Sequence, residues 1–435
     1  MNATGKLLGK SGPLIITFLA LLPVLFWLPF SDFSSPSKIW LSTGQFAGLA
    51  GYSLYALNII LSARFRFTEN LFVGLNRVYI FHHLVGIVAF VLMLYHPLGI
   101  AFSYLYISLS AAAGILIPSL SNVPVLFGIL AQLTTEVLIV LTLYVRLEYN
   151  FWKRTHQFLG GALFLASLHV VLIGSTLDQS LPLKLYLYAL AAVSLSCFTY
   201  RTLLGRILVK KRAYIVEKAA ALTQDIQEIV LKPESGKPII FHPGQFVFVE
   251  PQARGVPKES HPFSIVSARN SDRLVFASKS VGGFTETLKL ITPRTRFLVE
   301  GPFGRFSYDY FPNSHQLWIA GGIGVTPFIS MARSLKPDPG SKIDLYYLVK
   351  EESEAVYVRE LKQISQDVPN FHFVLHDSSK KGRLTVDSLS KDLPDLVQKE
   401  IFICGPPAMM SAYKKQFCEM KISSFRIHSE EFSLN

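Results

Sequence analysis

Hydrophobic and polar positions divide the chain into two halves of different character. Apolar runs dominate from Leu14 to Leu204, whereas the chain from Lys210 onward has the mixed composition of a globular protein. A helix needs about 20 mainly apolar residues to cross a bilayer. Six segments are long and apolar enough, and they are Pro13–Phe30, Gly44–Leu61, Tyr79–Ile100, Val123–Val145, Phe158–Leu177 and Leu183–Leu204. The pattern therefore predicts an α-helical six-span membrane bundle followed by a globular half.

A seventh apolar segment, Leu105–Leu120, leaves the number of spans open because it contains Gly114 and Pro118 and could be re-entrant or lie at the surface. Charge favours six spans. With six, the basic residues around 6–10, 64–77, 146–154 and 201–212 all fall on one side, which the positive-inside rule makes cytoplasmic. The third and fifth spans then run in the same direction, and the globular half that follows is expected in the cytoplasm.

The globular half shows two successive patterns. Short β-like runs begin at Ala213, and strands alternate with helices after His315. We therefore expect three domains: a transmembrane domain over 1–206, an all-β domain over 207–312, and an α/β domain over 313–435.

The formal net charge of +12 does not indicate a nucleic-acid-binding protein, because the basic residues of the first half cluster at the ends of apolar runs. Three cysteines without close spacing, Cys197, Cys404 and Cys418, predict neither a disulfide framework nor a zinc site.

Four histidines lie at matched positions in the third and fifth spans. His82 and His96 are 14 residues apart, and His156 and His169 are 13 apart, so each spacing is close to four helical turns, about 20 Å. Histidine inside a membrane is costly unless it has a function. Two facing pairs at two depths would ligate two haem irons from both sides. The alternative is that these histidines are packing residues.

Two details of this pattern remain open. His83 is an alternative to His82, although 14 residues place His82 and His96 more nearly on one helix face than 13 would. The 13-residue spacing fits one face poorly, so we expect the fifth span to be distorted or rotated.

The globular half contains two groups of glycine turns that suit nucleotides. In the first group, His261–Ser264 carries an aromatic–Ser pair that can flank a flavin ring, and Gly282–Thr285 would present backbone N–H groups to a pyrophosphate. In the second group, the turns Gly321–Pro327 and Cys404–Pro407 each follow a strand, at the sheet edge where open α/β folds bind nucleotides. The alternative for each motif is a plain structural turn.

These motifs resemble those of known families over nearly the whole chain. The globular half is similar to the ferredoxin–NADP reductase family, which carries a Pro-Phe-Ser-type motif in an antiparallel FAD barrel, and Gly-Gly-x-Gly-x-Thr-Pro and Cys-Gly-Pro-Pro in an α/β nucleotide domain. The membrane half resembles the ferric reductase/NADPH oxidase transmembrane domain, including Phe151–Trp152 ahead of His156.

The histidine pattern predicts two haems b held by His82, His96, His156 and His169. The resemblance implies FAD near His261, Pro262, Phe263, Ser264, Gly282, Gly283, Phe284 and Thr285. Lys279, which opens the same motif as this glycine loop, is also expected to bind the cofactor. The resemblance implies NADPH or NADH near Gly321, Gly322, Gly324, Thr326, Pro327, Cys404, Gly405 and Pro406.

Three further expectations concern specificity and the flavin cover. Lys350 and Arg383, with Lys380 and Lys381 nearby, would favour NADPH if they meet a 2′-phosphate, the alternative being solvated surface cations. Family members often end in an aromatic that covers the flavin, a role for Phe432 unless Leu434 takes the place. Ile100 stands where animal NADPH oxidases carry a histidine near the oxygen site, which weakens superoxide as the specific product.

Together these features predict a transmembrane oxidoreductase of the plasma or inner membrane. It would pass electrons from cytoplasmic NAD(P)H through FAD and two haems to oxygen or a ferric chelate outside, with Ser264 and Cys404 near the hydride-transfer site. Two rivals remain: a membrane-anchored flavin diaphorase whose histidines are structural, and a transporter with a nucleotide-sensing domain.

Overall fold

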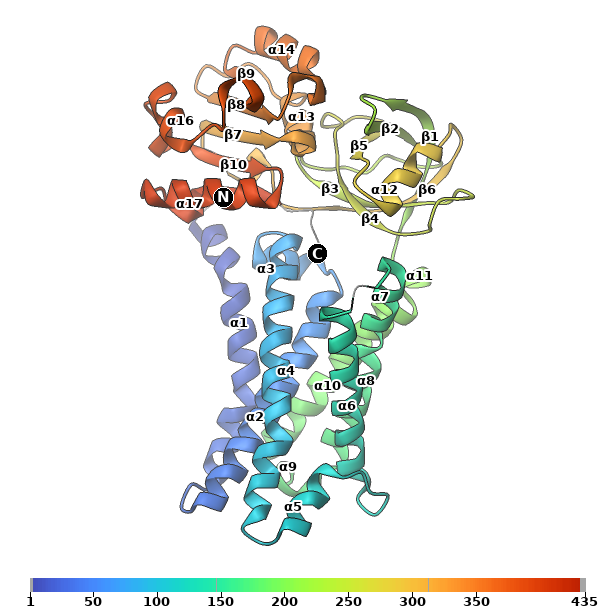
Figure 1. The fold of residues 1–435 in the computed structure, drawn as a ribbon, viewed down its shortest axis with the longest axis vertical. Helices are drawn as coiled ribbons and strands as arrows, with labels where there is room; N and C mark the ends of the chain where they lie inside the picture. Colours follow the sequence, from blue (N-terminus) through green and yellow to red (C-terminus); the bar gives the residue numbers. More distant parts are fainter. Residues whose placement is uncertain (1–2, 146, 312, 431–435) are drawn as a thin grey trace. The chain divides into compact units, whose positions relative to one another are not determined.

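The computed structural model describes residues 3–145, 147–311 and 313–430. The chain divides into two compact units, one formed by Gly5–Val209 and the other chiefly by Lys210–Asn435. Figure 1 shows long helices in the first unit and two sheets with short helices in the second.

The first unit is a bundle of apolar helices. Its elements are α1 (Ala3–Trp27), α2 (Pro36–Ser62), α3 (Arg66–Phe72), α4 (Leu75–Leu105), α5 (Leu109–Leu116), α6 (Val123–Leu143), α7 (Tyr149–Gln157), α8 (Leu159–Leu172), α9 (Gly174–Leu177), α10 (Leu181–Phe198), a π-helical turn (Thr199–Leu203) and α11 (Gly205–Leu208). Within the described residues, five stretches are long and apolar enough to cross a membrane, and α2 with α3, which is bent by 110°, makes a sixth if counted as one span. The expected six-span helical bundle is confirmed at this level.

Helix boundaries differ from the expected ones for local reasons. Helix α2 begins at Pro36, before the apolar run, because the Ser35 side chain accepts a hydrogen bond from the Lys38 N–H and caps the helix. The fifth span begins at Tyr149 and ends at Leu172, so it includes a polar first turn that hydropathy does not reveal. The ambiguous segment forms only the eight-residue α5, which at about 12 Å is too short to cross a bilayer.

Large apolar side chains on the outer faces of the bundle are exposed, including Ile80, Leu84 and Val91 on α4. In lipid this arrangement is stable, since the bilayer solvates apolar surface. Helices α2 and α4 approach closely where Gly44 meets Gly99, because a side chain at Gly99 would lie 2.8 Å from the Gly44 Cα. Small residues at such crossings are typical of membrane helix pairs.

The second unit contains two sheets. A nearly closed antiparallel sheet has the order β4-β3-β6-β1-β2-β5, and a parallel sheet has the order β11-β10-β7-β8-β9. The antiparallel strands are β1 (Arg212–Ala221), β2 (Ile226–Pro233), β3 (Phe246–Pro251), β4 (His261–Ser264), β5 (Leu274–Lys279) and β6 (Arg296–Phe303). The parallel strands are β7 (His315–Gly321), β8 (Lys342–Val349), β9 (Phe371–Asp377), β10 (Glu400–Cys404) and β11 (Ile427–Glu430).

Short helices accompany the sheets: α12 (Gly283–Thr287), α13 (Thr326–Ala332), α14 (Val358–Asp367), α15 (Ser378–Lys381), α16 (Val386–Asp392) and α17 (Pro407–Glu419). The strands β7 and β10 are buried along almost their whole length, as expected for a parallel sheet covered on both faces. The antiparallel β domain and the α/β domain expected from the sequence are both present.

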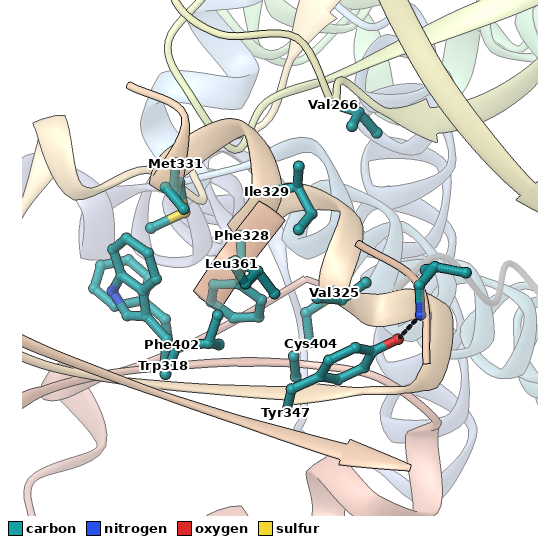
Figure 2. Packing of buried hydrophobic residues seen from close by; sticks show 14 of the residues in the cluster. Val266, Trp318, Val325, Phe328, Ile329, Met331, Tyr347, Leu361, Phe402 and Cys404 are labelled. Atoms are coloured by element: carbon teal, nitrogen blue, oxygen red, sulfur yellow. Dashed lines mark hydrogen bonds between the residues drawn. The ribbon is translucent and has the colours of Figure 1, made fainter. Parts of the chain in front are cut away.

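One apolar core joins the two sheets. It includes Val266 after β4, Trp318 on β7, Phe328 and Ile329 on α13, and Phe402 on β10, and Figure 2 shows these side chains together. Each of the five is fully buried, so the two domains of the globular half share a continuous interior.

Candidate redox site

The four span histidines lie in two pairs. The rings of His82 (α4) and His156 (α7) are 6.2 Å apart between centroids, with an interplanar angle of 65°. The rings of His96 (α4) and His169 (α8) are 6.4 Å apart, with an angle of 64°. Because His82 meets His156 and His96 meets His169, α4 must run in the same direction as α7 and α8.

These separations fit a metal ion between each pair. A metal–imidazole bond is about 2 Å long, and the ligating nitrogen is roughly 1 Å from its ring centroid, so an ion held from both sides separates the centroids by about 6 Å. Among the described residues no three His, Cys, Asp or Glu side chains gather as a metal site. Two imidazoles suit a haem, because the porphyrin provides the other four ligands.

The second ring nitrogen of each histidine faces an acceptor. The Nδ1 atoms of His82, His96 and His169 lie 3.1, 2.8 and 2.7 Å from backbone carbonyl oxygens of other helices, those of Asn58, Gly44 and Pro124. A proton on Nδ1 that is donated to a carbonyl leaves the Nε2 lone pair free to bind a metal. This is the tautomer that a haem ligand requires.

His156 is held differently from the other three. Its Nδ1 lies 3.5 Å from the Thr142 Oγ1, and that hydroxyl donates its own proton to the Leu138 carbonyl. The Thr142 oxygen is therefore available as an acceptor for His156. The Trp152 ring stacks on His156 at 5.3 Å, nearly parallel, and further restricts the imidazole.

Glycines on neighbouring helices provide the room for the His96–His169 pair. A side chain at Gly48 would lie 2.6 Å from the His96 ring, and one at Gly128 would lie 2.9 Å from the His169 ring. Any larger residue at either position would displace its histidine.

The expected distortion of the fifth span is present at Phe158. The Phe158 N–H donates to the Thr155 carbonyl at 3.1 Å, and the Gly161 N–H donates to the Phe158 carbonyl at 2.9 Å. These bonds span three residues, and a three-residue turn rotates the chain by about 20° more per residue than an α-helix. The tightened turn brings the 13-residue spacing closer to one face. The His83 side chain, in contrast, is exposed.

The two flavin motifs expected from the sequence come together in the β domain. The His261 ring on β4 stacks on the Phe284 ring of α12 at 4.0 Å, and its Nε2 lies 2.6 Å from the Glu259 carboxylate. Ser264 at the end of β4 is buried and pairs in register with Phe246 of β3. Pro262 and Phe263 lie between them on the same strand, opposite Phe248 and Val247.

The glycine loop before α12 is closed by a side-chain hydrogen bond. Gly282 has a φ of 150°, which a side chain would strain, and it opens the short helix that begins at Gly283. The Thr285 hydroxyl oxygen accepts from the Val281 N–H at 3.0 Å and thereby closes the loop. Lys279, at the end of β5 just before this loop, forms an ion pair with Asp225 at 3.2 Å.

The two turns of the α/β domain meet at the carboxyl ends of β7 and β10. Ala320 and Cys404 are register partners on these parallel strands, and a side chain at Gly324 would collide with the Cys404 carbonyl. Gly321 and Gly405 also approach each other closely, while Gly322 adopts a positive φ of 53°. Thr326, Pro327 and Pro406 stand at the helix starts that follow, those of α13 and α17.

Cys404 and Glu430 form a buried pair at this edge. Burial, and then the nearby Glu430 carboxylate, raise the pKa of the Cys404 thiol, so the thiol stays protonated at neutral pH. Glu430 is itself 4% exposed and lies opposite Cys404 in the β10–β11 register. Sequence reasoning passed over Glu430 because β11 is a four-residue strand with no distinctive pattern. Phe432 and Leu434, the expected flavin covers, lie outside the described residues.

The candidate 2′-phosphate residues follow neighbouring strands. Lys350 follows β8 and Arg383 follows α15, and both are exposed. Asp377 joins these segments: its Oδ2 accepts from the Glu352 N–H and its Oδ1 from the Ser379 N–H. The Ser379 side-chain hydrogen bond is the main cause that lowers the pKa of Asp377 to about 2. Lys380 lies 3.6 Å from this carboxylate.

Three family models match the chain in order. They are the ferric reductase like transmembrane component over residues 47–168, an FAD-binding domain over 213–307, and the oxidoreductase NAD-binding domain over 318–415. The chain belongs to a ferric reductase/NADPH oxidase-type family. This ferric reductase-like protein thus combines apolar helices that are long enough to cross a membrane with an FAD-binding domain and an oxidoreductase NAD-binding domain.

Curated relatives match part of the chain. The glycine betaine monooxygenase reductase subunit of Pseudomonas aeruginosa is 28% identical over 245 residues, which are 52% of this chain and 64% of that protein. Flavohemoprotein A of Dictyostelium discoideum is 24% identical over 239 residues, 51% of this chain and 60% of that protein. The ferric reductase-like protein therefore spans less than two thirds of the length of either relative.

Solved structures are similar at low identity. The Amycolatopsis cytochrome P450 reductase covers 51% of this chain and 70% of its own, with a TM-score of 0.45 and 23% identity. The flavohemoglobin of Malassezia yamatoensis covers 76% of this chain and 88% of its own, with a TM-score of 0.49 and 17% identity.

Proposed function

We propose that this ferric reductase-like protein is a transmembrane oxidoreductase. It takes electrons from cytoplasmic NAD(P)H and delivers them, by way of FAD and two b-type haems, to oxygen or ferric iron on the other side of the membrane. The observation that carries the proposal is the pair of histidine pairs, with centroid separations of 6.2 and 6.4 Å. All four Nδ1 atoms also face acceptors, which leaves all four Nε2 atoms free for metal.

The chain's own residues would prepare the haem sites before any haem binds. The carbonyls of Asn58, Gly44 and Pro124 orient their histidines, so little ligand entropy is lost on binding. Two axial imidazoles leave no open position on the iron, which favours electron transfer over oxygen binding at the metal. When bound, FAD accepts a hydride and releases single electrons, and the haems carry these electrons across the bilayer.

The globular half would bind the other two groups. The Gly282–Thr285 loop would hold the FAD pyrophosphate with backbone N–H groups, and Ser264 would face the reacting edge of the flavin. The turns at Gly321–Pro327 and Cys404–Pro406 would hold the dinucleotide. Cys404, kept as a neutral thiol, can approach the nicotinamide without adding charge, and Phe432 would cover the flavin.

Lys350 and Arg383 would make NADPH the preferred donor. Both are exposed cations next to segments that follow β8 and β9, on the edge where the nucleotide turns lie. A 2′-phosphate would gain charge-assisted hydrogen bonds from them that a 2′-hydroxyl cannot match.

The test is an anaerobic visible spectrum of the full chain in nanodiscs, supplied with haem and FAD, before and after NADPH. We expect reduced b-type bands at two haems per chain. His96→Ala should remove the haem held by His96 and His169. The matched control His83→Ala, at an exposed position of the same helix, should retain both haems. Flavin bleaching without haem bands in the haem-supplied wild type would contradict the relay and indicate a flavin diaphorase.

A further inference from the structure

Helix α13 bonds directly to the segment that follows β4. The Ser330 hydroxyl donates to the Ser267 carbonyl at 2.7 Å, and the Arg333 Nη1 donates to the Val266 carbonyl at 3.0 Å. Both acceptors lie just beyond Ser264 at the end of β4, and both donors lie just beyond the Gly321–Pro327 turn. We call this set of two bonds the α13 bridge.

Arg333 is fixed in the orientation that the bridge requires. Its Nε and Nη2 donate to the two carboxylate oxygens of Glu360 at 2.6 and 2.9 Å, which is a bidentate pair of the kind that fixes a guanidinium plane. Its guanidinium also lies 5.5 Å from the Tyr357 ring centroid. The Tyr357 hydroxyl in turn donates to Glu228 of β2 at 2.6 Å.

The bridge lies against an interior that excludes water. Ser330 is fully buried and Ser267 is 2% exposed, while Val266, Val325 and Ile329 beside them are fully buried. Figure 2 shows Val266 and Ile329 in this core. In such surroundings the Ser330–Ser267 hydrogen bond is stronger than it would be in water. The Arg333–Val266 bond is only partly buried, since 22% of the Arg333 side chain is exposed.

The bridge is short in both directions. Ser330 is four residues, about one helical turn, beyond Thr326. Ser267 is three residues beyond Ser264, about 10 Å along an extended chain. The Gly321–Pro327 turn and strand β4 are therefore connected through α13 and the segment after β4, which pack in one core. A change in the length of either bridge hydrogen bond would change the distance between the turn and the strand.

We propose that Ser330 and Arg333 are positioning residues for hydride transfer. By binding the Ser267 and Val266 carbonyls, they set the distance between the nicotinamide and the flavin. Neither side chain needs to touch a cofactor. The inference rests on the proposed placement of FAD at β4 and of the dinucleotide at the Gly321–Pro327 turn.

The experiment compares Ser330→Ala and Arg333→Met with a matched control in the full chain. The control is Arg359→Met, which removes an exposed cation from the neighbouring helix α14. Glu360→Gln is a third test variant, because it weakens the ion pair that fixes Arg333. Anaerobic stopped flow would record flavin bleaching with NADPH and with NADPH deuterated at C4.

A displacement of about 1 Å near the reacting atoms can cost roughly a hundredfold in rate. We therefore expect Ser330→Ala and Arg333→Met to slow flavin reduction between about tenfold and a hundredfold, with a larger isotope effect, a KM within about threefold of wild type, and unchanged flavin content. The Arg359→Met control should reduce flavin within twofold of the wild-type rate. Glu360→Gln should give a rate between those of wild type and Arg333→Met, because the Arg333 guanidinium is held less firmly.

A second readout uses protein without cofactors. Amide hydrogen exchange over residues 265–269 should be faster in Ser330→Ala than in wild type, and unchanged in Arg359→Met. If wild-type flavin is not reduced by NADPH, the proposed function itself is wrong. If NADPH reduces the wild-type flavin and both bridge variants do so within twofold of the wild-type rate, the positioning role is overturned. A lower Tm in these variants without a slower flavin reduction would also overturn it. Should Arg333→Met not fold, Arg333→Lys is expected to give an intermediate rate, and a wild-type rate there and in Ser330→Ala would overturn the inference.

Discussion

Gly48→Ala should weaken the binding of the haem between His96 and His169 without unfolding the bundle. The new Cβ would lie 2.6 Å from the His96 Nδ1 and 2.7 Å from its Cε1, whereas ordinary contacts begin near 3.4 Å. The imidazole must therefore move by roughly 0.8 Å. A shift of this size directed away from the Gly44 carbonyl would lengthen the 2.8 Å hydrogen bond to about 3.6 Å, which is beyond hydrogen-bonding range.

The expected magnitude follows from this displacement. Loss of one hydrogen bond costs about 1 kcal/mol, and loss of an outer-shell partner of a metal-binding histidine typically weakens metal affinity by roughly ten- to a hundredfold. Gly48→Ala should therefore be purified with about one haem per chain when haem is limiting. Excess haem should restore the second, with an altered midpoint potential because His96 can no longer donate to Gly44.

The assay is haem per chain by pyridine haemochrome, followed by a potentiometric titration. Gly161→Ala is the matched control, since it makes the same change in a membrane helix where nothing lies within 4 Å of the new Cβ. It should retain both haems. Two haems with wild-type potentials in Gly48→Ala would contradict this prediction, because His96 would then not be held between Gly48 and the iron.

Three further outcomes test the globular half. Because burial raises the pKa of Cys404, iodoacetamide at pH 8 should label exposed Cys418 and leave Cys404 unlabelled, as mass spectrometry would show; labelling of Cys404 in the folded protein would contradict its burial. Asp377 has its pKa lowered from 3.8 to about 2, so its contribution to stability is present above pH 4 and lost as the pH falls toward 2; Asp377→Asn should flatten the fall of Tm over that interval, and an identical fall would exclude this role. Arg383→Ala should raise the KM for NADPH by about tenfold and leave the KM for NADH unchanged, and equal effects on both donors would remove Arg383 from 2′-phosphate recognition.

The sequence alone determined the class of the protein and most of the membrane half. Long apolar runs must be helical in lipid, since no water is available to satisfy an open backbone, so the spans can be read without knowing what surrounds them. The histidine spacings and the order of glycine turns can be recognised from the sequence, because each depends on the period of a single helix or on one strand–turn–helix unit.

The contacts that each of these residues makes depend on the tertiary structure. The acceptors of His82, His96 and His169 are 24, 52 and 45 residues away in the chain, and they are backbone atoms, which carry no residue signature. Four other features depend on how distant segments pack. They are the pairing of His156 with His82 and not His83, the tightened turn at Phe158, the position of Glu430 beside Cys404, and the bond from Arg333 to Val266. Local patterns specify which element forms, while packing specifies which atoms it presents to its neighbours.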